Sequence, residues 1–289
     1  MEKFILRSKK LKKISLLLFL LSPLALASIP VQHTPYPGGI AVFDFETTHS
    51  NPKAFYRTVP LYTQHIKGNH WQVLLGIPLL EKAGEKSITI QDFSTRTLTV
   101  KIKTIQTTKD KPAAKQNIEL KGKKKKYVNP HTAHINRIKK ERVILGKARL
   151  FFSDKILSND AFIRPVPGVT TSPFGIKRLY NGQPRNPHTG IDYAGATDTP
   201  IKAPADGKVI LAGKYFFNGN AIFLDHGQGL VSVYIHMNKR IAKQGQMVKK
   251  GETIGTIGQT GRATGPHLHW GVYLNRTTVN PNLLMGKSI

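Results

Sequence analysis

Short runs of strand-forming residues, broken by turn signals about every 8–12 residues, constrain the fold of this chain more than any other feature. In the first part of the chain these runs span residues 39–45, 54–61, 70–77, 86–92 and 95–104. The last run alternates, with Leu98, Val100 and Ile102 on one face and polar side chains on the other. The pattern predicts a mainly β protein with a β-sandwich over residues 28–105.

The C-terminal part of the chain is also β in character. From about residue 151 it is rich in glycine and has strand-like runs at 208–211, 220–224 and 231–235. Residues 247–255 are expected to form a hairpin. Because strand signals outnumber helix signals, we expect an antiparallel β domain over residues 151–289, with long glycine-rich loops.

A basic segment, residues 106–150, separates the two β regions. Four consecutive cations, Lys123 to Lys126, are more typical of a solvated loop than of a binding site. In an exported protein the same run would be able to contact anionic wall polymer or lipid. We therefore interpret residues 106–150 as a basic linker.

Apolar residues within this linker predict a helix over about 131–146. Asn129 is the expected N-cap, and Pro130 suits the first turn. His131 and His134 lie three residues apart on that helix, a spacing that is able to bind metal. Because no carboxylate accompanies them, we interpret them as part of a solvated face.

Composition excludes several kinds of chemistry. The 289 residues contain no cysteine, which excludes disulfides, a thiol nucleophile and a thiolate zinc site. Any metal must be held by histidine and carboxylate. Lys and Arg number 44 against 16 Asp and Glu, a formal net charge of +28. Such a charge draws a protein to polyanions: nucleic acid, anionic lipid or an acidic cell-wall polymer.

The N-terminal residues are typical of a secretory signal peptide. Residues 1–13 carry six cations, residues 14–27 are almost wholly apolar, and the run ends in Ala25-Leu26-Ala27 before Ser28. The apolar run is shorter than a membrane span and contains a proline, although an uncleaved anchor stays open as an alternative. We expect residues 1–27 to be cleaved, leaving a periplasmic or secreted protein without a stable transmembrane span. Export disfavours nucleic acid as a partner and leaves envelope polymers.

Four histidines and one aspartate stand out in the C-terminal domain. His267 and His269 are two residues apart, so in a strand both side chains project from one face. His188 and Asp192 are four apart in a loop expected to run into a strand, where they also share a face. His236 lies at a strand end. An open zinc site needs three such ligands, and hydrolysis needs an acid or base beside it.

These residues lie in motifs that resemble the lysostaphin-type zinc metallopeptidases of bacterial cell walls. The matching segments are His188-x-x-x-Asp192, Tyr234-x-His236, Gly265-Pro266-His267-Leu268-His269-Trp270, and residues 171–175, 203–207, 225–227 and 250–252. The resemblance covers about residues 160–285. Residues 28–105 resemble the immunoglobulin-like domain that precedes some secreted cell-wall peptidases, through residues 39–42, 71–79 and 81–84.

This resemblance implies a role for each residue. His188, Asp192 and His269 would be zinc ligands, His267 the catalytic base, and His236 its assistant. Ser172, Arg178 and Tyr234 are either groove-lining or structural, and the sequence does not decide between these roles. The implied function is an exported zinc endopeptidase that hydrolyses peptide bonds in the stems or cross-bridges of peptidoglycan.

Three further hypotheses stay open beside this one. A catalytically silent relative would activate a cell-wall amidase, although the intact ligand set argues against it. Residues 203–211 and 248–256 resemble the hairpins of lipoyl or biotinyl carriers, but no motif for a modified lysine is present. Finally, the N-terminal domain and the linker would inhibit the enzyme if they covered its groove.

Overall fold

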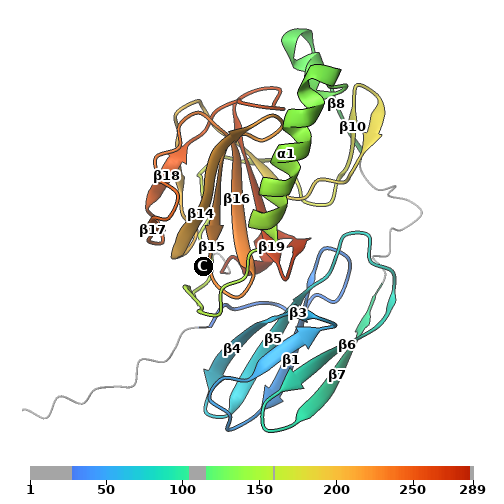
Figure 1. Cartoon of the computed structure of the whole chain (residues 1–289), viewed down its shortest axis with the longest axis vertical. Helices are drawn as coiled ribbons and strands as arrows, with labels where there is room; N and C mark the ends of the chain where they lie inside the picture. Colours follow the sequence, from blue (N-terminus) through green and yellow to red (C-terminus); the bar gives the residue numbers. More distant parts are fainter. Residues whose placement is uncertain (1–27, 104–114, 159, 287–289) are drawn as a thin grey trace, which may run out of the picture.

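The computed structural model describes residues 28–103, 115–158 and 160–286. The expected signal peptide, residues 1–27, and part of the expected linker, residues 104–114, lie outside these ranges. The described residues form two β bodies, with one long helix beside the larger body (Figure 1). The mainly β fold class is confirmed. None of the helices in the described ranges is long and apolar enough to cross a membrane.

The N-terminal body is a sandwich of two antiparallel sheets. The three-stranded sheet has the order β1 (Ile40–Glu46), β5 (His70–Gly76), β4 (Tyr62–Lys67). The four-stranded sheet has the order β3 (Val59–Pro60), β2 (Lys53–Tyr56), β6 (Gly84–Gln91), β7 (Thr95–Ile102). Buried apolar side chains from both sheets form one cluster: Ala41, Phe43, Phe45, Ala54, Leu61, Val73, Leu75, Ile77, Ile88, Ile90 and Ile102. The predicted sandwich is confirmed.

Two strands of the sandwich differ from the sequence prediction. The single run expected at 54–61 is divided into β2 and β3, because Arg57 has a φ of 56° and turns the chain back on itself. The sequence also gave no signal for β4. Its first three residues are buried whether apolar or polar, so no alternation marks the strand.

The C-terminal body is built on an eight-stranded sheet with antiparallel pairings. Its order is β17 (Met247–Val248), β14 (Gly207–Tyr215), β15 (Gly219–Asp225), β16 (Leu230–Met237), β19 (His267–Leu274), β12 (Ile191–Ala194), β9 (Thr170–Ser172), with β20 (Thr277–Val279) paired to β19. A two-stranded sheet joins β13 (Pro200–Lys202) to β18 (Thr253–Thr256). A short 3-10 helix, η2 (Pro281–Leu284), follows β20.

The prediction of a hairpin at residues 247–255 is wrong. β17 pairs with β14, whereas β18 pairs with β13. The turn between them bonds outward instead of closing a hairpin: the N–H of Gly251 donates to Ala203 O, and the N–H of Ala203 donates to Glu252 O, both at 2.8 Å. These bonds direct the chain from one sheet to the other.

The expected linker packs onto the C-terminal body where it is described. β8 (Lys115–Ile118) pairs in parallel with β10 (Lys177–Tyr180), which also pairs with β11 (Gln183–Arg185). The 3-10 helix η1 (Gly122–Tyr127) and helix α1 (Thr132–Arg149) follow. The domain bounds given by the sequence stay predictions, but residues 115–150 lie against the large body and do not form a free tether (Figure 1).

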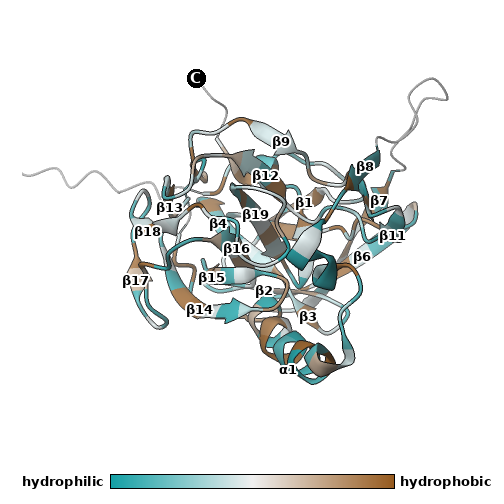
Figure 2. Cartoon of the chain, turned by 90° about the horizontal axis from the view of Figure 1, so that it is seen from above, coloured by the Kyte–Doolittle hydropathy of each residue, from teal (hydrophilic) through white to brown (hydrophobic). Residues whose placement is uncertain are grey.

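Helix α1 exists as predicted, but its N-cap differs from the predicted one. The side chain of His131, not that of Asn129, accepts from the N–H of Ala133, because the helix begins at Thr132 and Asn129 lies outside its first turn. Pro130 accordingly precedes the helix. Leu145 and Ala148 are the buried residues of α1, and they pack on the sheet. Hydrophobic and hydrophilic residues are mixed along the rest of the helix (Figure 2).

One side of the sandwich packs into the apolar core of the C-terminal body. Ile40, Tyr62 and Leu74 of the sandwich belong to the main cluster of the C-terminal body. Tyr62 Oη donates to Ser158 O at 3.2 Å, and the N–H of Gly76 donates to Asn275 Oδ1 at 3.3 Å. Burying a large apolar side chain stabilises a fold by about 1.5–3 kcal/mol, so this contact holds the bodies together.

Candidate active site

Three neighbouring strands of the large sheet position the predicted site. In the register, Asp192 of β12 lies opposite His269 of β19, and Ile235 of β16 lies opposite His269 on the other side. Strand alternation sends Leu268 and Trp270 into the core and turns His267 and His269 to the opposite face. The two-residue spacing of His267 and His269 therefore places both side chains on one face of the sheet, as predicted.

His188 reaches the same face from the loop before β12. A Cβ at Gly190 would lie 2.5 Å from Trp270 O and 2.8 Å from the ring of His269. Only glycine lets the loop pass this close to β19. The loop then delivers His188 next to Asp192, as expected for residues four apart in a loop that runs into a strand.

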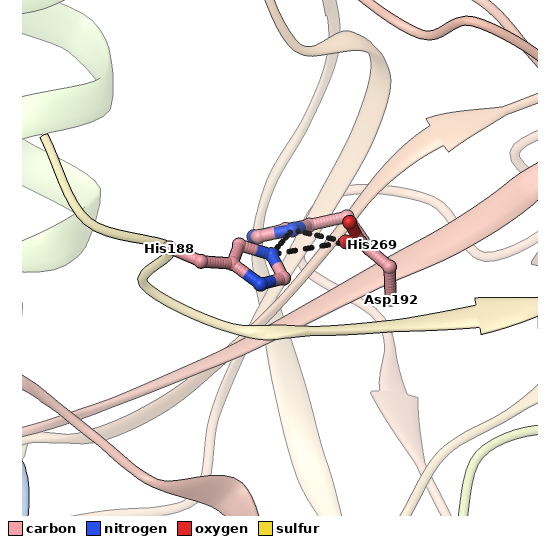
Figure 3. A group of neighbouring side chains, drawn as sticks. All are labelled: His188, Asp192 and His269. Carbon is pink, nitrogen blue, oxygen red and sulfur yellow. Dashed lines mark hydrogen bonds and ion pairs between the residues drawn. The ribbon is translucent and has the colours of Figure 1, made fainter. Parts of the chain in front are cut away.

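The donor atoms of three predicted ligands converge on one point (Figure 3). His188 Nε2 lies 2.9 Å from His269 Nδ1 and 3.0 Å from Asp192 Oδ1, and the last two atoms are 2.8 Å apart. His188 and Asp192 are buried, and the His269 side chain is 13% exposed. Two imidazole nitrogens and one carboxylate oxygen make the donor set of an open zinc site.

This donor set fits a zinc ion. The Nδ1–H of His188 donates to Pro173 O at 2.9 Å, which leaves Nε2 with its lone pair toward the cluster. Tetrahedral zinc with bonds of about 2.0–2.1 Å needs its ligand atoms about 3.3 Å apart. The observed separations are a few tenths of an ångström shorter, so small side-chain shifts would admit the ion.

Electrostatics favour the protonation states that bind metal. Burial disfavours the charged form of Asp192, but the close contacts of its carboxyl with the rings of His188 and His269 outweigh burial and hold the pKa of the carboxyl well below its usual range. Burial lowers the pKa of His269 to about 4, although Asp192 opposes this shift. At neutral pH the site therefore holds a carboxylate and a neutral imidazole, which are the ligating forms.

Arg178 fixes the other oxygen of the carboxylate. Its Nη2 donates to Asp192 Oδ2 and, at 2.9 Å, to Ser172 Oγ, while its Nε donates to Gln116 Oε1 at 3.2 Å. The Arg178 side chain is only 10% exposed. Ser172 and Arg178 therefore contact the cluster. Gln116 was missed because it comes from β8, far away in the sequence.

His236 and His267 stand beside the cluster. Their ring centroids are 5.0 Å apart, and that of His236 lies 6.3 Å from that of His269. Each ring donates its Nδ1–H to a backbone carbonyl, Thr260 O at 2.8 Å for His236 and Gly265 O at 2.9 Å for His267. Nε2 of each ring is left as the basic nitrogen.

His236 is held under backbone and electrostatic strain. Its φ is 66°, in the left-handed region that non-glycine residues rarely adopt and that is often found at functional sites. Burial, together with the neighbouring His267 and His269, holds the pKa of His236 well below its usual range. The ring is therefore neutral at neutral pH, with the lone pair of Nε2 free.

Other residues singled out in the sequence lie away from the cluster. Tyr234 is fully buried and shares a 2.8 Å hydrogen bond with Ser232 Oγ, so it supports the core and does not line the groove. His226 is also buried, with its Nδ1–H donating to Asp206 O at 2.7 Å. His131 caps α1, and the ring centroid of His134 lies 4.9 Å from that of Phe216.

Two cavities flank His236. The larger, of 390 Å³, reaches His188 and His269, and the smaller, of 270 Å³, reaches Asp192 and His267. Within the described ranges, none of the residues 28–103 lines either cavity, and inhibition by the N-terminal domain and the linker stays a prediction. The linker does reach the smaller cavity, through Gln116 and Ile118.

One lysine of the basic run is not solvated as predicted. Lys124 Nζ donates to Gln259 O at 3.0 Å and to Ala263 O at 2.6 Å, two carbonyls of the loop before β19. Burial lowers the pKa of Lys124. This contact ties the linker to the loop that carries His267.

Comparisons with known proteins identify the family. Residues 186–281 match Peptidase family M23, and residues 33–104 match the Peptidase family M23 N-terminal domain. A crystal structure of a peptidase M23 from Pseudomonas aeruginosa is 36% identical, with a TM-score of 0.72, over 89% of this chain and 97% of that chain. The chain belongs to peptidase family M23, which confirms the predicted resemblance.

Two curated relatives match the C-terminal part. The "Peptidoglycan DD-endopeptidase ShyC" of Vibrio cholerae is 42% identical over 113 residues, which cover 38% of this chain and 26% of the relative. The "DD-carboxypeptidase/endopeptidase Mpg" of Neisseria meningitidis is 41% identical over 111 residues, 38% of this chain and 26% of the relative. The chain thus spans about a quarter of their length, and the individual roles of the five site residues stay predictions.

Proposed function

We propose that this chain is an exported zinc endopeptidase that hydrolyses peptide bonds in the stems or cross-bridges of peptidoglycan. The observation that carries this proposal is the convergence of His188 Nε2, Asp192 Oδ1 and His269 Nδ1, with two more histidines beside them. Membership in peptidase family M23 and the printed names of the peptidoglycan-cleaving relatives support it.

In this proposal His188, Asp192 and His269 hold the zinc ion. When bound, zinc supplies Lewis-acid chemistry: it lowers the pKa of a water molecule to about 7 and polarises the carbonyl to be attacked. Arg178 keeps the carboxylate of Asp192 in its ligating orientation through Oδ2. The carbonyl of Pro173 keeps His188 in the tautomer that presents Nε2.

The other two histidines handle protons. His267 accepts the proton of the attacking water at Nε2, because its Nδ1–H is already donated to Gly265 O. His267 would then pass this proton to the leaving amine, while neutral His236, whose Nδ1–H is held by Thr260 O, assists as an acceptor at Nε2. Both positions border the cavities, so a peptide lying along the groove would pass both rings.

Export and envelope binding complete the proposal. The sequence of residues 1–27 has the organisation of a signal peptide, and a peptidoglycan substrate lies outside the cytoplasm. Cleavage of residues 1–27 would remove six cations and one anion, and the remaining formal charge of about +23 would hold the protein on anionic envelope polymers. Binding to isolated wall sacculi should then weaken as ionic strength rises, and salt-independent binding would refute the electrostatic part.

The alternative is a catalytically silent protein that activates a cell-wall amidase. Such a protein has no need of a complete ligand set, and here all three donors are present and oriented. Zinc content separates the two functions: about one ion per chain supports the peptidase, whereas metal-free protein purified with zinc present supports the activator.

Digestion of purified peptidoglycan tests the proposal. Protein comprising residues 28–289 is incubated with cross-linked sacculi, and the products are identified by mass spectrometry. We expect loss of cross-linked dimers, abolished by a chelator and by His269→Ala. If zinc-loaded protein releases no new peptide ends, the peptidase proposal is wrong.

A further inference from the structure

A cluster of arginines lines the larger cavity beside the three donor residues. Its members come from the end of α1, from β10 and β11, and from the loop before β19: Arg149, Arg178, Arg185 and Arg262. No aspartate or glutamate is among the residues that line this cavity. The cavity is therefore strongly positive on the side that faces His188, His236 and His269.

Most of these charges lack an acidic partner. Arg178 pairs with Asp192, but no carboxylate of the described residues lies within 4.0 Å of Arg149, Arg185 or Arg262. Arg185 instead donates to neutral oxygens, such as Val128 O at 3.1 Å and Gln183 Oε1 at 2.7 Å. Its charge is satisfied by dipoles, whereas Arg149 and Arg262 have free donor capacity.

Aromatic rings hold these two guanidinium groups in place. Arg262 Cζ lies 4.4 Å from the ring centroid of Tyr180 and 4.9 Å from that of Phe217. Arg149 Cζ lies 5.8 Å from the centroid of Tyr273, and its buried Nε has no hydrogen-bond partner. Cation–π contacts fix the orientation of a guanidinium but leave its N–H groups free to bind an anion.

The cluster is electrostatically unfavourable as it stands. Burial lowers the pKa of Arg262, and the positive charges of Arg178 and Arg185 add to that effect. Like charges that are partly shielded from solvent repel one another, and an anion bound between them would reduce this repulsion. Guanidinium groups match carboxylates, which they bind with two parallel hydrogen bonds.

We propose that Arg149 and Arg262 form a carboxylate subsite next to the metal-binding cluster. The enzyme then prefers peptides that carry a free carboxylate on one side of the bond to be cleaved. This inference rests on the proposed peptidase function, whose substrate class it narrows. The carboxylate belongs either to the C-terminus of the peptide or to an acidic side chain, and both would be recognised by the same chemistry.

The test uses synthetic cross-linked peptides in three forms. One form has all carboxylates free, one has the C-terminal carboxylate amidated, and one has the side-chain carboxylates amidated. A charge-assisted hydrogen bond contributes about 1.5–3 kcal/mol, so we expect kcat/KM to fall about tenfold or more in one amidated form. The form that loses activity identifies which carboxylate occupies the subsite.

Variants assign the preference to the two arginines. In Arg149→Gln and Arg262→Gln the ratio of kcat/KM between free and amidated substrate should fall toward one. Arg240→Gln removes a charge from an exposed residue of the same body that does not line the cavity, and it should keep the wild-type ratio. If Arg262→Gln fails to fold, Arg262→Lys replaces it in the test, because lysine keeps the positive charge but cannot form two parallel hydrogen bonds to a carboxylate.

Each outcome decides a different claim. Equal cleavage of all three forms by the wild type overturns the subsite but leaves the peptidase function intact. A preference that survives in both arginine variants overturns the assignment to these residues. If zinc-loaded protein cleaves none of the peptides, the proposed peptidase function is wrong. Calorimetric binding of the same three peptides then tests the subsite, and equal affinity for the free and amidated forms would overturn it.

Discussion

Arg178 Nη2 donates a hydrogen bond to Oδ2 of Asp192, while Oδ1 of the same carboxylate lies 2.8 Å from His269 Nδ1. The two oxygens therefore have different partners, and the orientation of the carboxylate is fixed by a buried cation. Residues that orient metal ligands in this way typically account for 10–100-fold in metal affinity.

Removing this cation should weaken metal binding. We expect Arg178→Gln to lower zinc affinity about 10–100-fold, because Asp192 loses the partner that holds its Oδ2. Competition with a chromophoric chelator measures the affinity. The exposed Arg240→Gln is the matched control and should bind zinc like the wild type. An unchanged affinity in Arg178→Gln would show that the histidines alone orient the carboxylate.

The two histidines of β19 should separate in mutagenesis. His269→Ala is expected to abolish stoichiometric zinc binding, because its Nδ1 belongs to the donor cluster. His267→Ala should keep zinc and lower kcat about 10²–10⁴-fold, as expected for loss of a general base. Zinc content and turnover are measured on the same preparations. The assignment is reversed if His267→Ala loses the metal and His269→Ala retains it.

Buried His226 should make the stability of the protein depend on pH. Burial lowers its pKa to about 4, from an unfolded value of about 6.5, so between these values only the unfolded chain binds the proton. Stability is full above pH 6.5 and falls by up to about 3 kcal/mol as the pH drops to 4. His269, with its pKa also lowered to about 4, acts in the same direction in metal-free protein.

Denaturant unfolding of metal-free protein at pH 7 and pH 4.5 measures this loss. His226→Gln retains a donor and an acceptor for Asp206 O and Ser232 Oγ but does not titrate. The variant should be less stable than the wild type at pH 7 and should lose less stability on acidification. Equal losses in wild type and variant would mean that His226 is not the titrating group.

The packing of the sandwich into the C-terminal core should couple the two bodies in unfolding. Tyr62 and Leu74 are fully buried in the main cluster of the C-terminal body. Leu74→Ala should destabilise the whole protein by about 2–5 kcal/mol in a single transition. Leu80, which is 79% exposed, provides the control Leu80→Ala, with an expected change within about 0.5 kcal/mol. Two separate transitions, with only the first shifted, would contradict the coupling.

Local pattern was sufficient to predict much of the site. The alternation of β7 and the two-residue spacing of His267 and His269 both depend on strand geometry, which a short segment determines by itself. The spacing of His188 and Asp192 predicted proximity for the same reason. These predictions needed no information about which strands pair with which.

Features that depend on long-range pairing were not visible in the sequence. Gln116 and Arg149 reach the site only because β8 pairs with β10 and α1 packs on the sheet. The segment that carries both residues looks like a polar linker when it is taken alone. The expected hairpin at 247–255 was wrong for a similar reason, since bonds to Ala203 direct the chain into another sheet. Tertiary context overrides local pattern in such cases.

Titration of metal-free protein with zinc, followed by the rate of cleavage of cross-linked peptidoglycan, tests the proposed function most directly. We expect no cleavage before zinc is added, a rate that rises to saturation at one equivalent, and no rise in His269→Ala. Full activity in metal-free protein, or zinc binding without any cleavage, would contradict the assignment of His188, Asp192 and His269 as the metal centre of a peptidase.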